Sequence, residues 1–248
     1  KWGKFAKAWF WINEKVACVV GNHLIADNPG IASHLASRFL DNKITMIPYG
    51  STELKSADQQ MLSTLKLDKE TYALVVARAE PENSILEIVQ AFSRVEHSLK
   101  LVILGNFEPL SNPYHKAVME AAGDEVIFPG PIYDKEILAA LRFYARFHIH
   151  GHQVGGTNPS LVEALGAGNA IISRDNTFNR WVAKDAALYF DSEMEASQAI
   201  DRLIANDQLV ENLRAAARIN FEENFKWDSI LTQYECLLLK YLPNSHQR

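Results

Sequence analysis

The chain has 248 residues, of which 48% are hydrophobic and 22% charged, and its formal net charge at pH 7 is −5. This composition is typical of a globular protein with one large or two smaller domains and ample material for a core. The mild acidity and the lack of a long Lys/Arg run argue against a nucleic-acid-binding protein. Cys18 and Cys236 lack Cys-x-x-Cys spacing, so we expect free, buried thiols in a reducing compartment.

The first fifty residues predict a helix followed by a strand, a second helix and a second strand. Apolar residues recur at helical spacing in the first helix, at Trp2, Phe5, Trp9, Ile12 and Val16. Residues 23–27 and 44–50 are typical of strands, and they flank a helical segment, 29–39, with a proline near its start. These elements are too few for a domain of their own. Because the chain also opens on Lys1 rather than Met, we expect residues 1–50 to be the tail of a larger N-terminal domain.

The first helix has two interpretations. One is a core helix whose partners lie outside this sequence, since an apolar stripe with scattered lysines is common. The other is an interfacial membrane helix, because tryptophans accompany Lys1, Lys4, Lys7 and Lys15. No apolar run reaches the roughly 20 residues that a membrane-spanning helix needs, and no signal peptide is visible.

The rest of the chain alternates between strand and helix patterns. Six short, almost continuous apolar runs predict strands buried on both faces of a parallel sheet: 72–78, 99–105, 125–130, 146–151, 169–173 and 187–190. Helical patterns separate them at 84–95, 115–123, 135–145 and 160–168. This alternation predicts a doubly wound α/β domain with a parallel sheet over residues 51–222. Residues 223–248 would then form a closing segment, with one long helix at 225–242.

Ligands of such sheets bind at the carboxyl ends of the strands, where Arg78 follows the first predicted strand. An arginine there can hold a phosphate with two parallel hydrogen bonds. Asn83 or Ser84 could cap the next helix and leave its free N–H groups facing the same crevice. The alternative is a solvent-exposed arginine paired with Glu80 or Glu82.

A second candidate site follows residues 146–151. Gly155 and Gly156 would let the backbone approach a ligand closely. Asn158 suits a helix N-cap and Pro159 the first helical position, so the positive end of this helix would face the crevice. Glu163, one turn further, could accept hydrogen bonds from sugar hydroxyls. The alternative is an ordinary strand-to-helix turn with a solvated glutamate.

Three histidines offer a third possibility. His148, His150 and His152 alternate, which on a strand places them on one face. A His-x-His pair on a strand can bind zinc and would indicate a metal-dependent hydrolase. However, a further protein ligand is not evident, and Gly151 suggests that the strand ends before His152. Histidines that are structural or face a ligand are the favoured interpretation.

Several segments taken together resemble the C-terminal half of GT-B glycosyltransferases of family 4, from about residue 23 to 242. They are "VVARAEPEN", "VIFPGPIYDKEILAALRFYARFHIHGH", "GGTNPSLVEALGAGNAIISRD", "DAALYFD" and the terminal "FKW…Y" helix. Within the family, "VGGTNPSLVEA" and "DNTFNRWV" are most similar to a subgroup of bacterial polysaccharide glycosyltransferases that includes rhamnosyltransferases.

The resemblance implies a role for each site residue. Arg78 would hold the donor diphosphate and stabilise the leaving group as it develops charge, and Glu163 would bind the nucleotide ribose; these two are the expected catalytic residues. Gly155 and Gly156 would let the diphosphate and sugar approach the backbone.

Two positions depart from the family pattern. The glutamate that usually contacts the donor sugar is replaced by Gly155, and the usual phosphate-binding lysine by Asn83. Thr157, Asn158 and His152 are then the nearest candidates for donor-sugar contacts. The second positive charge would come from Arg180 or Lys184, which are further donor-site candidates.

The sequence thus favours the donor-binding half of a retaining glycosyltransferase. It would use a nucleotide-diphosphate sugar and a saccharide or lipid-linked acceptor in bacterial surface polysaccharide synthesis, and we expect no activity from this half alone. No Asp-x-Asp motif occurs, so we expect neither a metal nor a cofactor. A cytoplasmic location is expected, with peripheral contact at the inner face of the membrane if the first helix is interfacial. The alternatives are a non-catalytic nucleotide-sugar-binding module and the zinc hydrolase.

Overall fold

The computed structural model of the chain describes residues 2–38 and 43–242. The chain forms two compact units, Lys1–Pro48 and Tyr49–Arg248. Lys1, the end of the predicted helix 29–39 and the last six residues of the predicted closing segment lie outside the described residues. Within the described residues, no helix is both long enough and apolar enough to cross a bilayer.

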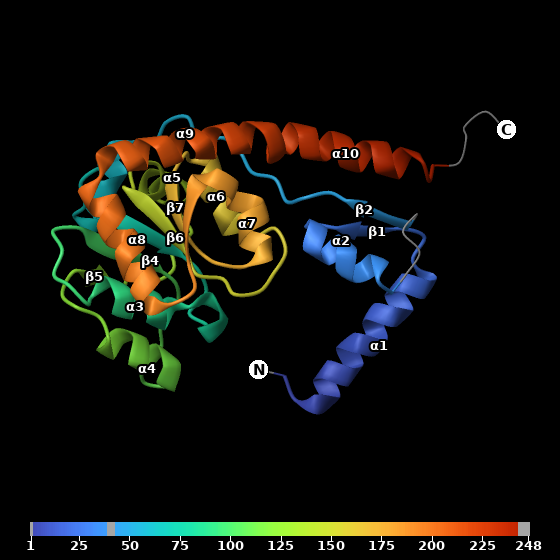
Figure 1. The fold of residues 1–248 in the computed structure, drawn as a ribbon, viewed down its shortest axis with the longest axis horizontal. Helices are drawn as coiled ribbons and strands as arrows, with labels where there is room; N and C mark the ends of the chain where they lie inside the picture. The colour runs from blue at the N-terminus through green and yellow to red at the C-terminus, as the bar shows by residue number, and fades with distance from the viewer. Residues whose placement is uncertain (1, 39–42, 243–248) are drawn as a thin grey trace. The chain divides into compact units, whose positions relative to one another are not determined.

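The first unit contains helix α1 (Lys4–Val20), strand β1 (Leu24–Ala26), helix α2 (Pro29–Ala36) and strand β2 (Ile44–Met46) (Figure 1). The two strands pair in parallel. Asn28 caps α2 by accepting a hydrogen bond from the amide of Gly30, and Pro29 occupies the first turn as expected. Most large apolar side chains of α1 are exposed; Phe5 is 95% exposed and Trp9 65%.

The second unit is built on a six-stranded parallel sheet with the strand order β5-β4-β3-β6-β7-β8. The strands are β3 (Tyr72–Val76), β4 (Lys100–Leu104), β5 (Val126–Ile127), β6 (Phe147–His150), β7 (Ala170–Arg174) and β8 (Ala187–Phe190). The order reverses between β3 and β6, the point at which doubly wound sheets bind ligands. The predicted fold class is therefore confirmed.

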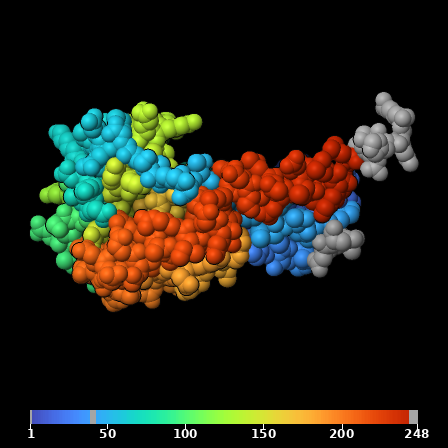
Figure 2. Space-filling view, turned by 90° about the horizontal axis from the view of Figure 1, so that it is seen from above, coloured from blue at the N-terminus to red at the C-terminus, as the bar shows by residue number. Residues whose placement is uncertain are grey.

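Helices cover both faces of this sheet (Figure 1). They are α3 (Ile85–Phe92), α4 (Pro113–Glu120), α5 (Lys135–Phe143), α6 (Pro159–Gly166), α7 (Thr177–Ala183), α8 (Glu193–Ala205) and α9 (Asp207–Asn224), with short 3₁₀ turns η2 (Gln59–Leu65), η3 (Pro81–Asn83) and η4 (Lys184–Ala186). The last helix, α10 (Trp227–Leu239), extends past the sheet (Figure 1). Helices α9 and α10 follow one another along one side of the unit (Figure 1 and Figure 2).

The two faces of the sheet are filled differently. One large apolar cluster joins α3, α4 and α8 to one face and includes Phe147 and Ile149 of β6. The other face carries two separate clusters, one around α6, α7 and β7 and one around η2, α5 and β3. Strand β6 runs between these two clusters, and there it presents His148, which lies between Leu74 and Ile171 in the strand register. A polar strip thus divides the core on this face.

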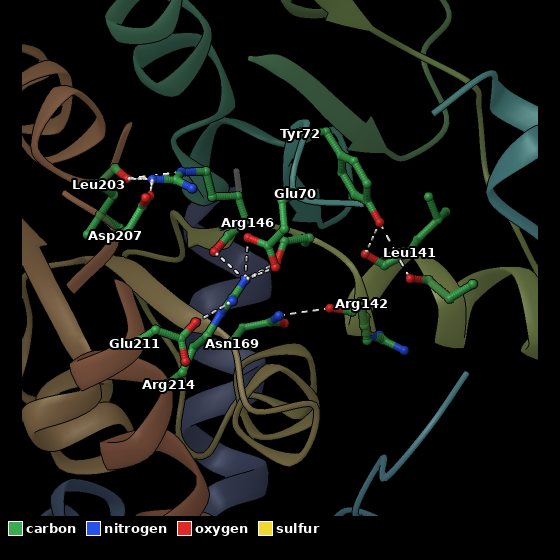
Figure 3. Close-up of polar contacts among 12 residues, drawn as sticks. Glu70, Tyr72, Leu141, Arg142, Arg146, Asn169, Leu203, Asp207, Glu211 and Arg214 are labelled. Carbon is green, nitrogen blue, oxygen red and sulfur yellow. Dashed lines mark hydrogen bonds and ion pairs between the residues drawn. The ribbon is translucent and has the colours of Figure 1, made fainter. Parts of the chain in front are cut away.

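The amino ends of the strands are joined by arginines (Figure 3). Arg214 of α9 donates to the Glu70 carboxylate, at 2.7 and 2.9 Å, and to the carbonyl oxygens of Ala145 and Arg146. Arg146 donates in turn to the carbonyl oxygens of Leu203 and Ile204. These charge-assisted bonds satisfy carbonyl groups just before β6 and in the last turn of α8.

Some elements differ from the sequence expectations. Helices α7, α8 and α9 were not predicted, although the buried residues of α8 include Ala196, Ala199, Ile200 and Leu203 at helical spacing. Their small side chains and polar neighbours gave a weak apolar signal. The predicted closing helix at 225–242 is present as α10, and the unpredicted α9 ends just before it, at Asn224. Cys18 is buried, but Cys236 lies on the exposed face of α10, so the expectation of two buried thiols was wrong.

Candidate functional site

The loops after β3 and β6 lie together at the carboxyl edge of the sheet, because these two strands are neighbours. The Gln153 amide donates to the Glu82 carbonyl at 2.9 Å, and the Gln153 side chain donates to the Ser84 hydroxyl at 3.0 Å. A Cβ atom at Gly151 would overlap the carbonyl oxygen of Asn83, so only glycine permits this approach. The structure therefore brings the predicted Arg78 loop and the predicted histidine loop into one place.

The Arg78 loop is held by its own backbone. The Arg78 carbonyl accepts hydrogen bonds from the Glu80 amide and from the Asn83 side chain, both at 2.8 Å. Asn83 is only 1% exposed, so its amide group is occupied inside the loop. Ser84 holds the N-cap position of α3 with a positive φ of 51° but makes no side-chain cap bond. The expected capping of this helix by Asn83 or Ser84 was wrong, because both side chains are used in the loop contacts.

The three histidines form a stack that runs from the core to the crevice. The ring centroids of His148 and His150 are 6.3 Å apart, and those of His150 and His152 are 4.3 Å apart with nearly parallel planes. His148 and His150 are 0% and 1% exposed. Among the described residues, neither ring nitrogen of His148 has a hydrogen-bond partner, and the same holds for Nε2 of His150 and Nδ1 of His152.

Burial keeps these imidazoles neutral. Burial, assisted by the nearby charge of Arg142 and by His152, lowers the pKa of His148 to about 3. Burial and the Arg78 charge lower the pKa of His152 to about 4. The pKa of His150 also falls well below its usual value, mainly through burial. The loops that carry Arg78 and His152 are joined by the hydrogen bond from the Gln153 amide to the Glu82 carbonyl.

The stacked geometry does not favour the zinc hypothesis. A metal ion binds imidazole nitrogens in the plane of the ring, and parallel stacked rings cannot aim their in-plane lone pairs at one point. Within the described residues, no group of three or more His, Cys, Asp or Glu side chains is arranged to hold a metal ion.

Helix α6 begins as the sequence predicts. The Asn158 side chain accepts hydrogen bonds from the amide of Ser160 at 3.1 Å and from its hydroxyl at 2.9 Å, and Pro159 is the first helical residue. The Ser160 hydroxyl lies 3.5 Å from Nδ1 of His150. Just before the helix, Thr157 is buried, and Gly155 has a φ of +143°. The amino end of α6 therefore adjoins the histidine stack, and the stack adjoins Arg78.

Glu163 lies apart from Arg78. Its carboxylate accepts a hydrogen bond from Nη2 of Arg142, and both residues line a pocket of about 450 Å³ together with Trp227. Arg78 lines a different pocket, of about 350 Å³, with the backbone after β4 and the segment around Tyr133. Leu138 of α5 borders both pockets. The sequence expected both side chains in one crevice, and the structure places them in two adjoining hollows.

Arg180, the expected second positive charge, is engaged elsewhere. It donates to both carboxylate oxygens of Asp175, at 2.5 and 2.6 Å, and its guanidinium lies over the Tyr189 ring at 4.4 Å. These bonds from Arg180 lower the pKa of the Asp175 carboxyl. Lys184, the other candidate, accepts a hydrogen bond from the Tyr189 hydroxyl through its carbonyl oxygen.

The sequence of residues 56–220 matches the family described as Glycosyl transferases group 1. This match covers most of the second unit, including Arg78, Arg142 and Glu163. The chain belongs to the group 1 glycosyl transferases. No curated protein sequence matches it significantly.

Solved structures of glycosyl transferases share its fold. Sucrose-phosphate synthase from Thermosynechococcus elongatus is 20% identical with a TM-score of 0.81, over 94% of this chain and 61% of that one. A glycosyltransferase from Rickettsia africae is 15% identical with a TM-score of 0.79, over 94% and 67% of the two chains. Anabaena HepE in complex with UDP and glucose is 12% identical with a TM-score of 0.81, over 92% and 66%. The chain thus spans about two thirds of the length of these proteins, and the expected GT-B type of fold is confirmed.

Sequence reasoning missed Arg142 of this glycosyl transferase. Lys135, Leu138, Ala139 and Arg142 stand at positions i, i+3, i+4 and i+7 of α5 and line the Glu163 pocket together. That spacing defines one face of a helix and was visible in the sequence. Arg142 lies in the last turn of a helix and not directly after a strand, so the usual place of ligand sites at strand ends does not point to it.

Proposed function

We propose that this chain carries the nucleotide-sugar site of a retaining, family 4 glycosyltransferase. The enzyme transfers a sugar from a nucleotide-diphosphate donor to a saccharide or lipid-linked acceptor in bacterial surface polysaccharide synthesis, as rhamnosyltransferase-like members do. The observation that carries the proposal is the meeting of Arg78, His152 and the amino end of α6 at the point where the strand order reverses. The chain supplies the donor-binding half, which we expect to be inactive alone.

In this proposal the diphosphate binds between Arg78 and α6. Arg78 offers a planar set of donors, and the amino end of α6 offers backbone N–H groups and about half a unit of positive charge. Gly155, Gly156, Thr157 and Asn158 form the backbone that approaches the donor sugar.

In this proposal the nucleotide base and the ribose bind in different pockets. The Arg78 pocket is lined mainly by apolar groups that include Ile132, Tyr133 and Leu138, which suits a planar base. The ribose hydroxyls donate hydrogen bonds to Glu163 in the neighbouring pocket, which Leu138 also borders. Asn83 and Arg180 stay in the proposed donor site only as groups that shape it, since their side chains already have partners.

Binding of nucleotide sugars tests the proposal. A thermal-shift panel of UDP-, dTDP- and GDP-sugars should raise the melting temperature for one base, because a ligand at a hundred times its Kd stabilises the fold by about 2.7 kcal/mol. Calorimetry on Glu163→Ala should then show a loss of about 1.5–3 kcal/mol of binding free energy, the value of a hydrogen bond to a charged group. No shift with any donor would overturn the proposal.

The Gly155 and Asn83 departures support a second candidate, a non-catalytic nucleotide-sugar-binding module. Turnover by the chain joined to an acceptor-binding half separates the two, because a module would bind the donor and transfer nothing. Donor binding is proposed to be independent of metal, so EDTA should leave it unchanged and elemental analysis should find no stoichiometric zinc. One zinc per chain, lost on mutation of His148 and His150, would restore the hydrolase hypothesis.

A cytoplasmic location is part of the proposal. Helix α1 bears on whether the protein also contacts the membrane. Its exposed Phe5 and Trp9, beside Lys4 and Lys7, suit either packing against further protein or contact with an anionic bilayer. Sedimentation with phosphatidylglycerol vesicles distinguishes these, since only the bilayer contact predicts co-sedimentation that Phe5→Ser and Trp9→Ser abolish.

A further inference from the structure

We propose that Arg142 is a positioning residue that holds the Glu163 carboxylate in the orientation that receives a ribose. This inference rests on the proposed role of Glu163. The contact itself is direct, from Nη2 of Arg142 to Oε2 of Glu163.

The two side chains differ in exposure in the way such a role requires. The Arg142 side chain is 12% exposed and the Glu163 side chain 37% exposed. The guanidinium therefore holds the carboxylate from the protein side, while the carboxylate faces the pocket of about 450 Å³ that both residues line. One carboxylate oxygen is engaged by Arg142, which leaves the second oxygen's lone pairs for a sugar hydroxyl.

The backbone of Arg142 is also held in place. Its carbonyl oxygen accepts a hydrogen bond from the Asn169 side chain at 2.8 Å (Figure 3). Asn169 is 1% exposed and directly precedes β7. The backbone of Arg142 is thereby tied to the residue that precedes β7. An arginine held in this way can fix the Glu163 carboxylate in one orientation.

Arg142 occupies a place where folding alone would favour an apolar residue. It lies on the polar strip between two apolar clusters, close enough to His148 to lower the pKa of that imidazole. Its Nε has no hydrogen-bond partner among the described residues. Burial lowers the pKa of Arg142 as well, while Glu163 opposes that shift. A buried ion pair is often no more stabilising than apolar side chains of similar size, so its value here lies in orientation.

The test is a double-mutant cycle read by calorimetry with UDP, the nucleotide bound in the HepE structures. If the wild-type protein binds GDP or dTDP instead, that nucleotide and its 2′,3′-dideoxy analogue replace UDP and 2′,3′-dideoxy-UDP. We expect Arg142→Met and Glu163→Gln each to raise the Kd of UDP about tenfold, a typical value for one hydrogen bond to a charged group. The double variant should be no weaker than Glu163→Gln, because Arg142 acts through that carboxylate.

Two further measurements separate positioning from a structural role. The affinity for 2′,3′-dideoxy-UDP should be the same in wild type and Arg142→Met, since that ligand has no hydroxyl for Glu163. Arg142→Lys should recover part of the UDP affinity, and it keeps the test open if Arg142→Met does not fold. Arg94→Met, which removes an exposed ion pair with Glu193, is the matched control and should leave binding unchanged.

The outcomes are distinct. Additive losses in the double variant, equal losses with both ligands, or unchanged UDP affinity in Arg142→Met and Arg142→Lys would overturn the role of Arg142 and leave the proposed function standing. If no nucleoside diphosphate binds the wild-type protein, the proposed function falls and this inference falls with it.

Discussion

The two edges of the large sheet differ in whether their polar side chains have hydrogen-bond partners. At the amino edge, Arg146 and Arg214 donate to backbone carbonyl oxygens and to carboxylates on other elements (Figure 3). At the carboxyl edge begins the stack of His152, His150 and His148, which runs into the core; His152 is partly buried and the other two are buried, and four of their nitrogens lack hydrogen-bond partners within the described residues. Unpaired buried groups cost free energy. The amino edge therefore stabilises the fold through satisfied polar groups, whereas the other edge keeps buried polar groups that lack partners among the described residues.

The largest expected effect tests the amino edge. Arg214→Met should lower the free energy of unfolding by about 3 kcal/mol, because two carbonyls and the Glu70 carboxylate lose their donor. Urea denaturation measures the change, and nucleotide affinity should stay the same. Arg202→Met, on the exposed side of α8, is the control. A loss below 1 kcal/mol would show that this edge is not the more stabilising one.

The second prediction tests the carboxyl edge through ligand binding. Arg78→Ala should weaken binding of a nucleoside diphosphate by roughly 2–3 kcal/mol, since it removes a charge-assisted hydrogen-bond donor. Arg78→Lys should have a smaller effect, because lysine is only a point charge. Calorimetry with nucleoside, monophosphate and diphosphate measures both. Equal weakening of all three ligands would mean that Arg78 acts on the fold or on the base pocket that it lines, and that the phosphate site lies elsewhere.

The third prediction concerns pH. The pKa of His148 is about 3 in the fold, against 6.5 ordinarily, so the unfolded chain takes up its proton first as the pH falls. Stability from this group is complete above about pH 6.5 and decreases toward pH 3, and by pH 5 the loss is about 2 kcal/mol relative to pH 8. His152 acts in the same direction.

Urea denaturation at pH 8 and pH 5 measures this loss in the wild type and in His148→Leu. The variant should lose about 2 kcal/mol less than the wild type between these two pH values. Equal losses in the two proteins would indicate that His148 is solvated and that the stack is not a buried polar strip.

The smallest expected effect returns to the amino edge. The Tyr72 hydroxyl donates to the Leu141 carbonyl at 2.8 Å, and burial raises the pKa of this phenol. Tyr72→Phe should therefore cost about 1 kcal/mol of unfolding free energy. Tyr133→Phe is the control, because Tyr133 is 87% exposed. A larger loss in the control than in Tyr72→Phe would contradict the assignment.

Sequence patterns predicted the parallel sheet because its strands are short apolar runs, and they predicted the start of α6 because Asn158 and Pro159 are local signals. They could not predict which side chains meet across elements. The pairing of Glu163 with Arg142 and the bonds of Asn83 inside its loop depend on how α5, α6 and the loop after β3 pack. Likewise, the sequence does not show that Arg78 and Glu163 line two different pockets, both of which are bordered by Leu138.

Gly155 constrains how the site could be redesigned. The resemblance expects a glutamate there, and space is available, since a Cβ at Gly155 would meet no atom within 4 Å. The obstacle is the backbone, whose φ of +143° strains any L-amino acid by about 1–3 kcal/mol. A single Gly155→Glu exchange would therefore bring back the carboxylate but not its native loop. Restoring the contact that the resemblance implies therefore also requires changes in the neighbouring peptide units that relax this φ.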